Sequence, residues 1–156
     1  MIAKKFKPSI AELGPIIEEM IKNGKSIKLT VTGNSMYPLF RNRQDDVVLE
    51  GCSDFKKYDV VLYRRQNGRY VFHRILKIDG DVFTIAGDNE IEKECPVYKS
   101  ACIAKLKSFE RFGKEYTTDV LWYKLYVRFW LLIFPYRHKL IKLIKAIARI
   151  KSKFAK

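Results

Sequence analysis

The feature that most constrains the fold is a series of short runs between residues 26 and 113 in which β-branched, aromatic and aliphatic residues dominate. Turn-forming stretches separate the runs, among them Asn67-Gly68, Asp79-Gly80 and Phe112-Gly113. Six or so short strands in about 85 residues predict a small, mostly antiparallel β-domain with hairpins. The runs are IKLTV, DVVLEG, DVVLYRR, RYVFHRILKI, DVFTIAG and SACIAKLKSF.

Helical patterns flank this series on both sides. We divide the chain into a helical segment at 1–25, the β-domain at 26–116 and an aromatic, basic, amphipathic helical tail at 117–156. Gly14 and Pro15 predict a break within the first helix. The expected fold class is therefore mainly β, of the α+β type. The first segment has no apolar run long enough for a secretory signal or a membrane anchor.

The positive charge of the chain is concentrated in the tail. The net charge is +14, and residues 120–156 carry ten Lys or Arg and no Asp or Glu. The first 119 residues carry only +4, which is ordinary for a globular domain. Any partner selected by charge is therefore expected to bind the tail.

Cofactor and metal chemistry have little support in the sequence. The chain has no Gly-rich phosphate loop and only two histidines, and its three cysteines form no C-x-x-C pair. We expect no cofactor, no metal site and no disulfide framework.

One histidine and one serine stand out in the β-domain. In YVFHRIL, strand alternation places His73 on the same face as Val71 and Ile75, where a structural histidine is the simpler interpretation. Ser35 follows the first run on a turn, and Asp88 lies in the turn after DVFTIAG. A serine hydroxyl needs a base, and a neutral imidazole oriented by a carboxylate supplies one. The chain thus holds one candidate for each member of a Ser-His-acid site.

The local motifs carry a resemblance to a known family. The stretch GNSMYPLF resembles the G-x-S-M-x-P nucleophile box of the signal peptidase I superfamily, and YDVVLYR, HRILKIDGD and AGDNE are similar to the boxes that follow it in the same order. The resemblance covers roughly residues 30–103. It is specific because all four boxes occur, and occur in the same order as in the superfamily. It implies a catalytic β-domain, with Ser35 as nucleophile and His73 as general base.

The residue at the base position indicates the branch of the superfamily. The bacterial leader peptidase type has a lysine there, whereas His73-Arg74 resembles the Ser-His branch. In that branch an acid near the G-D-N box assists the histidine, which implies Asp88 as the orienting acid here, with Glu94 as the second candidate. More narrowly, the chain resembles small bacterial members that lack an N-terminal transmembrane helix.

The resemblance also implies residues around the scissile bond. The backbone N–H of Ser35 would be one oxyanion donor, and Gly33 stands where some relatives have a hydroxyl donor, so that the second donor would come from the backbone or from Asn34. Met36 would line the substrate site, although an ordinary core position explains it equally well. Substrates of the superfamily are extended peptide segments with small side chains, which pair naturally with an exposed strand edge.

The tail is too short and too charged to be a clear transmembrane helix. Residues 120–134 form an apolar run of 15 that contains Lys124 and Arg128, whereas a spanning helix needs about 20 apolar residues. Aromatic residues beside a cationic face are typical of an interfacial helix, so we expect residues 120–156 to bind a membrane surface. The expected location is peripheral, at the cytoplasmic face of a bacterial membrane, with the outer face as the alternative. A helix packed on the β-domain and a nucleic-acid contact are the alternatives, the latter without any recognition motif.

These patterns predict a serine endopeptidase of the signal peptidase type that cleaves leader or signal segments of precursors. The alternative is a catalytically inactive peptide- or membrane-binding protein that keeps the peptidase fold. A related self-cleaving repressor is disfavoured, because no DNA-binding domain precedes the β-domain and the base position holds a histidine.

Overall fold

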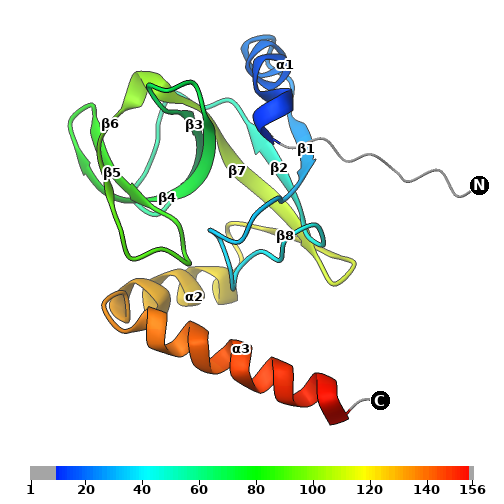
Figure 1. Ribbon diagram of the computed structural model, residues 1–156. Helices are drawn as coiled ribbons and strands as arrows, with labels where there is room; N and C mark the ends of the chain where they lie inside the picture. The colour runs from blue at the N-terminus through cyan, green and yellow to red at the C-terminus, as the bar shows by residue number, and fades with distance from the viewer. Residues whose placement is uncertain (1–9, 155–156) are drawn as a thin grey trace, which may run out of the picture.

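The computed structural model describes residues 10–154; residues 1–9 of the predicted helical segment and residues 155–156 of the tail lie outside the described part. One antiparallel sheet of eight strands carries a helix before it and two after it, which gives the mainly β, α+β class that the sequence predicts (Figure 1). The elements are α1 (Ile10–Lys22), β1 (Ile27–Thr30), β2 (Asp46–Glu50), β3 (Val60–Arg64), β4 (Tyr70–Asp79), β5 (Val82–Ala86), β6 (Glu94–Tyr98), a short 3₁₀ turn (Lys99–Ala101), β7 (Cys102–Arg111), β8 (Lys114–Thr117), α2 (Leu121–Leu132) and α3 (Arg137–Phe154).

The sheet is bent rather than flat. Its strand order is β1-β2-β7-β3-β4-β5-β6, with β8 added to β7. Register shifts interrupt the β2–β7, β3–β7, β4–β5 and β5–β6 ladders. Because such irregularities increase strand twist, β3 to β6 curl round on one side while β1, β2 and β7 extend to the other (Figure 1).

Two apolar clusters form on the two faces of this bent sheet, and β3 contributes to both. Its alternate residues point to opposite faces, so that Val60 and Leu62 join the main core while Val61 and Tyr63 line the inside of the curl. The main core also receives side chains from α1, β1, β2, β7 and α2. The tail therefore shares the core of the β-domain.

The predicted break in the first helix is wrong, because α1 runs through Gly14 and Pro15. A Cβ at Gly14 would lie 2.0 Å from the ring of Tyr70 in β4, so glycine permits the helix to pack closely on the sheet. Ile17 and Ile21 are buried at the same contact. This tertiary packing outweighs the local cost of the proline.

The two C-terminal helices pack differently on the rest of the molecule. Tyr123, Val127 and Trp130 of α2 are buried, whereas α3 buries Arg137 and Ile141 near its start. Among residues 10–154, no helix combines the length and the apolar character needed to cross a bilayer.

Candidate active site

The turn that holds Ser35 is anchored on both sides. Gly33 has a φ of +92°, a conformation that glycine adopts without strain, and its N–H donates to Asn42 Oδ1 at 3.0 Å. After the serine, Met36, Leu39 and Phe40 are buried in the main core. Ser35 itself is half-exposed, on a turn that a hydrogen bond holds before it and buried side chains hold after it.

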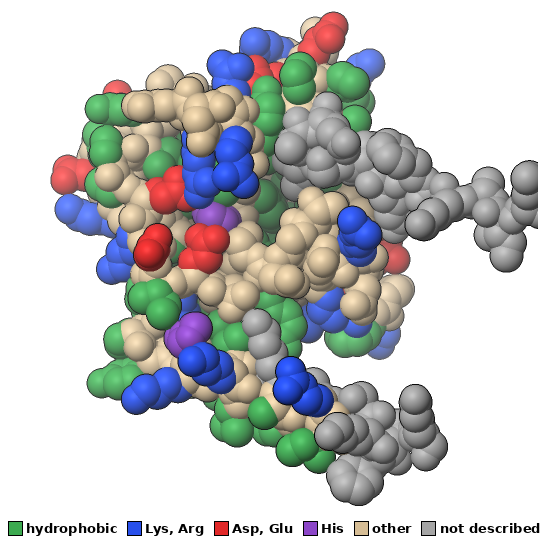
Figure 2. Space-filling model, in the orientation of Figure 1, with side chains coloured by type: hydrophobic (Ala, Val, Ile, Leu, Met, Phe, Trp, Pro, Cys, Tyr) green, Lys and Arg blue, Asp and Glu red, His purple; other side chains and the backbone are tan. Residues whose placement is uncertain are grey.

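His73 and Ser35 line the same cavity. The imidazole is 3% exposed, and β4 places it opposite Val61 of β3. The cavity has a volume of about 260 Å³, and Met36 and Glu90 are also among its lining residues. Figure 2 shows a histidine in the middle of this face, between basic side chains above and acidic side chains below. Within the described part of the chain, Ser35 Oγ and His73 share a cavity but no hydrogen bond.

The turn after β5 holds the serine turn against the imidazole. The N–H of Asn89 donates to the Ser35 carbonyl at 2.7 Å, and its side-chain amide donates to the Asn34 carbonyl at 2.9 Å. A Cβ at Gly87 would lie 2.6 Å from the Ser35 carbonyl oxygen and 3.1 Å from His73 Nε2. Glycine at this position therefore brings three segments into contact.

Two glutamates approach the two nitrogens of His73. Glu94 Oε1 lies 3.7 Å from Nδ1, and Glu90 Oε2 lies 3.6 Å from Nε2. In a Ser-His-acid site the acid faces Nδ1 and the serine faces Nε2, so Glu94 occupies the position of the orienting acid. Nδ1 is buried and has no hydrogen-bond partner among the described residues, which leaves it free to donate to a carboxylate that moves closer. Burial lowers the pKa of His73, and the two glutamates partly oppose that shift.

The carboxylate of Asp88 points elsewhere. It accepts hydrogen bonds from Arg74 Nε at 2.9 Å and Nη2 at 2.8 Å, and a third from the Tyr126 hydroxyl at 3.2 Å. Both members of this ion pair are almost fully buried. The backbone of Asp88 thus lies beside the site, while its side chain fixes the turn to β4. The geometry favours Glu94 over Asp88 as the acid beside His73.

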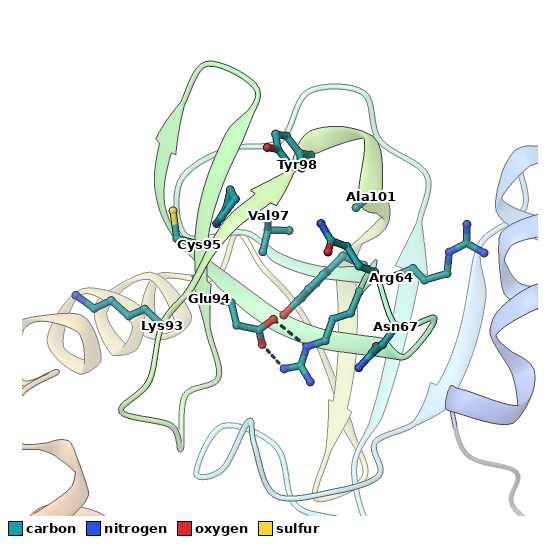
Figure 3. Close-up of a pocket in the computed structure, with 12 residues that line it drawn as sticks. Arg64, Asn67, Lys93, Glu94, Cys95, Val97, Tyr98 and Ala101 are labelled. Carbon is teal, nitrogen blue, oxygen red and sulfur yellow. Dashed lines mark hydrogen bonds and ion pairs between the residues drawn. The ribbon is translucent and has the colours of Figure 1, made fainter.

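Arg65 holds Glu94 in place. Its guanidinium donates from Nε to Glu94 Oε2 at 2.8 Å and from Nη2 to Oε1 (Figure 3). Burial acts to raise the pKa of Glu94, but the favourable interactions of the carboxylate with its neighbours, Arg65 first among them, together outweigh burial and lower that pKa overall. A second cavity, of about 490 Å³, opens between the β3–β4 turn and β6, and Arg65 lines both cavities. No motif in the sequence indicated Arg65 or Glu90 as site residues.

Residues of the tail support the same turn from below. Trp130 Nε1 donates to the Asp88 carbonyl at 2.8 Å, and the buried Arg137 donates from Nη2 to the Gly87 carbonyl at 2.8 Å. For Trp130 and Arg137, the tail thus packs on the β-domain, which the sequence left open as the alternative to a membrane contact. The tail is a structural neighbour of the site.

Comparisons of the chain with protein-family models, with curated proteins and with solved structures give no match. What the site can do must therefore be argued from its own geometry. In the described ranges, no three His, Cys, Asp or Glu side chains lie close enough together to hold a metal ion. The groups that remain are a serine, a buried imidazole, two carboxylates and the N–H of Ser35, which donates to no acceptor in residues 10–154.

Proposed function

We propose that the protein is a serine endopeptidase of the signal peptidase type, with Ser35 as nucleophile, His73 as general base and Glu94 as the orienting acid. One observation carries the proposal. Ser35 and His73 line one cavity, in which Glu90 lies 3.6 Å from Nε2 of the imidazole, while the carboxylate of Glu94, held by Arg65, lies 3.7 Å from Nδ1. A hydrogen bond between nucleophile and base is often formed only when substrate binds.

The chemistry follows from these positions. As Ser35 Oγ attacks the scissile carbonyl carbon, its proton passes to His73 Nε2, and the oxyanion of the tetrahedral intermediate accepts a hydrogen bond from the N–H of Ser35. The imidazolium then gives the proton to the departing amine, leaving an acyl-serine. Water, deprotonated by the same nitrogen, attacks the ester and releases the acid product and the free hydroxyl. Glu94 stabilises the imidazolium in both steps.

An extended peptide fits the architecture. β1 and β6 are the two ends of the strand order, so each has one edge without a strand partner in the described sheet. The Ser35 turn follows β1, and Glu94 is the first residue of β6. Both free edges therefore begin or end at the site, where the main chain of a precursor can pair with them.

The tail supports a peripheral contact with a membrane. α2 and α3 leave large apolar side chains exposed, in a segment without acidic residues. We place the enzyme at the surface of an anionic leaflet, with residues 120–156 as the contact.

Replacing the nucleophile or the base tests the enzymatic proposal. Ser35→Ala and His73→Ala should abolish cleavage of a library of extended peptides with small residues, measured by mass spectrometry, because each removes one participant in the first proton transfer. Ser100→Ala is the matched control, since Ser100 is an exposed serine that does not line the Ser35 cavity. Full cleavage by either site variant would refute the assignment.

The alternative, a catalytically inactive binding protein, makes a different prediction for the same library. The wild-type protein would then bind peptides and release them uncut, and Ser35→Ala would bind them equally well. In cells, peptides that accumulate both without the protein and with Ser35→Ala would identify the precursor.

A further inference from the structure

The helix α2 is apolar on two opposite sides. Its buried side packs on the β-domain, and its outward side exposes Leu121, Leu125, Phe129 and Leu132, of which Leu132 is 79% exposed. An exposed apolar face of this kind marks an interaction surface.

The exposed face of α3 has the same character with more charge. Leu143, Ile147 and Ile150 are exposed, and Lys139 and Lys142 are exposed on the neighbouring side of the helix. Figure 2 shows hydrophobic and basic side chains together over the C-terminal helices. A surface that is apolar and cationic, with no acidic residue in 120–156, is complementary to an anionic lipid surface.

A cavity of about 270 Å³ opens on the flank of α2, between this helix and the segment that leads into β3. Four cations line it: Lys56 and Lys57 come from the β-domain, and Lys124 and Arg128 come from α2. The backbone of Tyr58, between the two sides, has a φ of +82°, an unfavourable value for a bulky residue.

The two acids that line the cavity do not cancel this charge. Asp119 pairs with Lys124 at 3.7 Å and is itself largely exposed. Asp59 accepts a hydrogen bond from the N–H of Lys56 at 2.9 Å, and burial raises its pKa. Lys57 and Arg128 form no ion pair with a described residue, and Lys57 Nζ lies 4.9 Å from the centre of the Tyr58 ring, so at least two of the cations are not neutralised by an acid.

The position of the cavity indicates what it binds. Along the surface of α2, Lys124 follows Leu121 by three residues, and Arg128 lies three residues after Leu125 and four before Leu132. The cationic rim therefore continues directly into the exposed apolar face. This order, a cationic hollow beside an apolar surface, matches a lipid headgroup beside its acyl chains.

We propose that this cavity binds the phosphate headgroup of an anionic phospholipid when the exposed face of α2 lies on the membrane. The inference rests on the membrane contact proposed above and adds a defined site in the β-domain to it. Lys56 and Lys57 are the decisive residues, because they lie outside the basic tail and a tail that binds by charge alone would not need them.

Vesicle binding tests the site without any use of catalysis. We would measure co-sedimentation of the full chain with vesicles of phosphatidylcholine containing phosphatidylglycerol, and with phosphatidylcholine alone. Lys56→Gln/Lys57→Gln should weaken binding to the anionic vesicles roughly thirty-fold, since each cation beside the surface contributes about one factor of five. Lys22→Gln/Lys25→Gln is the matched control, because both lysines are exposed near the end of α1, across the molecule from α2 (Figure 1). It should change binding less than three-fold.

Each other result overturns a different part of the inference. Equal losses for the two pairs would show that only overall charge matters and that the cavity is not a site. No binding of the wild-type chain to anionic vesicles would refute the membrane contact itself, while leaving the peptidase proposal intact. A third result would be that the wild-type chain binds inorganic phosphate in solution without vesicles and loses that binding in Lys56→Gln/Lys57→Gln. That result would show that the cavity binds a free phosphate and not a lipid headgroup. Circular dichroism and thermal unfolding would establish that all variants fold.

Discussion

Asp88 and Glu94 are both acids near His73, and their contacts differ, so that one pair of substitutions can separate the roles that we propose for them. Asp88→Asn and Glu94→Gln each remove one charge and keep the shape of the side chain. Asp88 is paired with Arg74 in a contact that excludes water almost completely, whereas Glu94 is partly exposed and lies beside Nδ1 of the imidazole. The first substitution should therefore affect stability and the second should affect catalysis.

The burial of the ion pair sets the size of the stability effect. Removing one partner of a buried pair leaves an uncompensated charge, at a cost of about 3–5 kcal/mol. This cost is a large part of the total stability of a folded domain, which is about 5–15 kcal/mol. For a domain of this size it should lower the midpoint of thermal unfolding of Asp88→Asn by roughly 10 °C. The partly exposed pair of Arg65 and Glu94 contributes about 1 kcal/mol or less. Loss of the acid beside the base should slow cleavage at least tenfold, because general-base catalysis contributes about 10² to 10⁴.

Urea unfolding and peptide cleavage, measured on the same two proteins, decide between the roles. Nuclear magnetic resonance titration of His73 adds a readout that needs no substrate. Glu94→Gln should lower the pKa of His73 further, because in the wild type the negative charge of Glu94 opposes the effect of burial. If Asp88→Asn unfolds within 1 kcal/mol of the wild type and Glu94→Gln cleaves normally, our assignment of the two acids is wrong.

Two further predictions concern the imidazole and the glycine packed against it. Burial holds the pKa of His73 below the ordinary value of 6.5, and the base acts when neutral, so the acid limb of the pH profile of kcat/KM should lie below pH 6.5. Stability should likewise be lost as pH falls through that lowered pKa. An acid limb centred above pH 6.5 would contradict the burial of the base. Gly87→Ala should lower the free energy of unfolding in urea by about 1–3 kcal/mol and reduce cleavage, because its Cβ would lie 2.6 Å from the Ser35 carbonyl oxygen and displace that turn. Unchanged stability and cleavage would show that the contact is not tight.

Most of the sheet could be predicted because alternation and turn residues are local signals. All six predicted runs contain a strand of the structure. The two strands without a prediction, β6 and β8, lack those signals. β6 contains Pro96, which is tolerated because the strand lies at an end of the sheet order, and β8 has only four residues.

The site was predictable only in part. The sequence could nominate Ser35 and His73, and the structure places both on one cavity. The sequence placed Asp88 before Glu94 as the orienting acid. The direction of the Asp88 carboxylate could not be predicted, because it depends on Arg74, a residue whose burial is set by contacts between distant segments. In the same way, the tail shows its charge in sequence, but the contact of Trp130 with the turn after β5 is a tertiary feature.

The side chain of Arg74 has a consequence for how the molecule comes apart. Besides Asp88, it donates to the carbonyl of Tyr58 and to the hydroxyl of Tyr123, so one buried guanidinium joins the turn after β5, the wall of the basic cavity and the first turn of α2. Groups that share one such centre unfold together rather than one after another. A fragment trimmed at residue 119 would keep every proposed catalytic side chain and still lose the partners that keep this centre dry. The β-domain, as a unit of cooperative folding, extends into the tail.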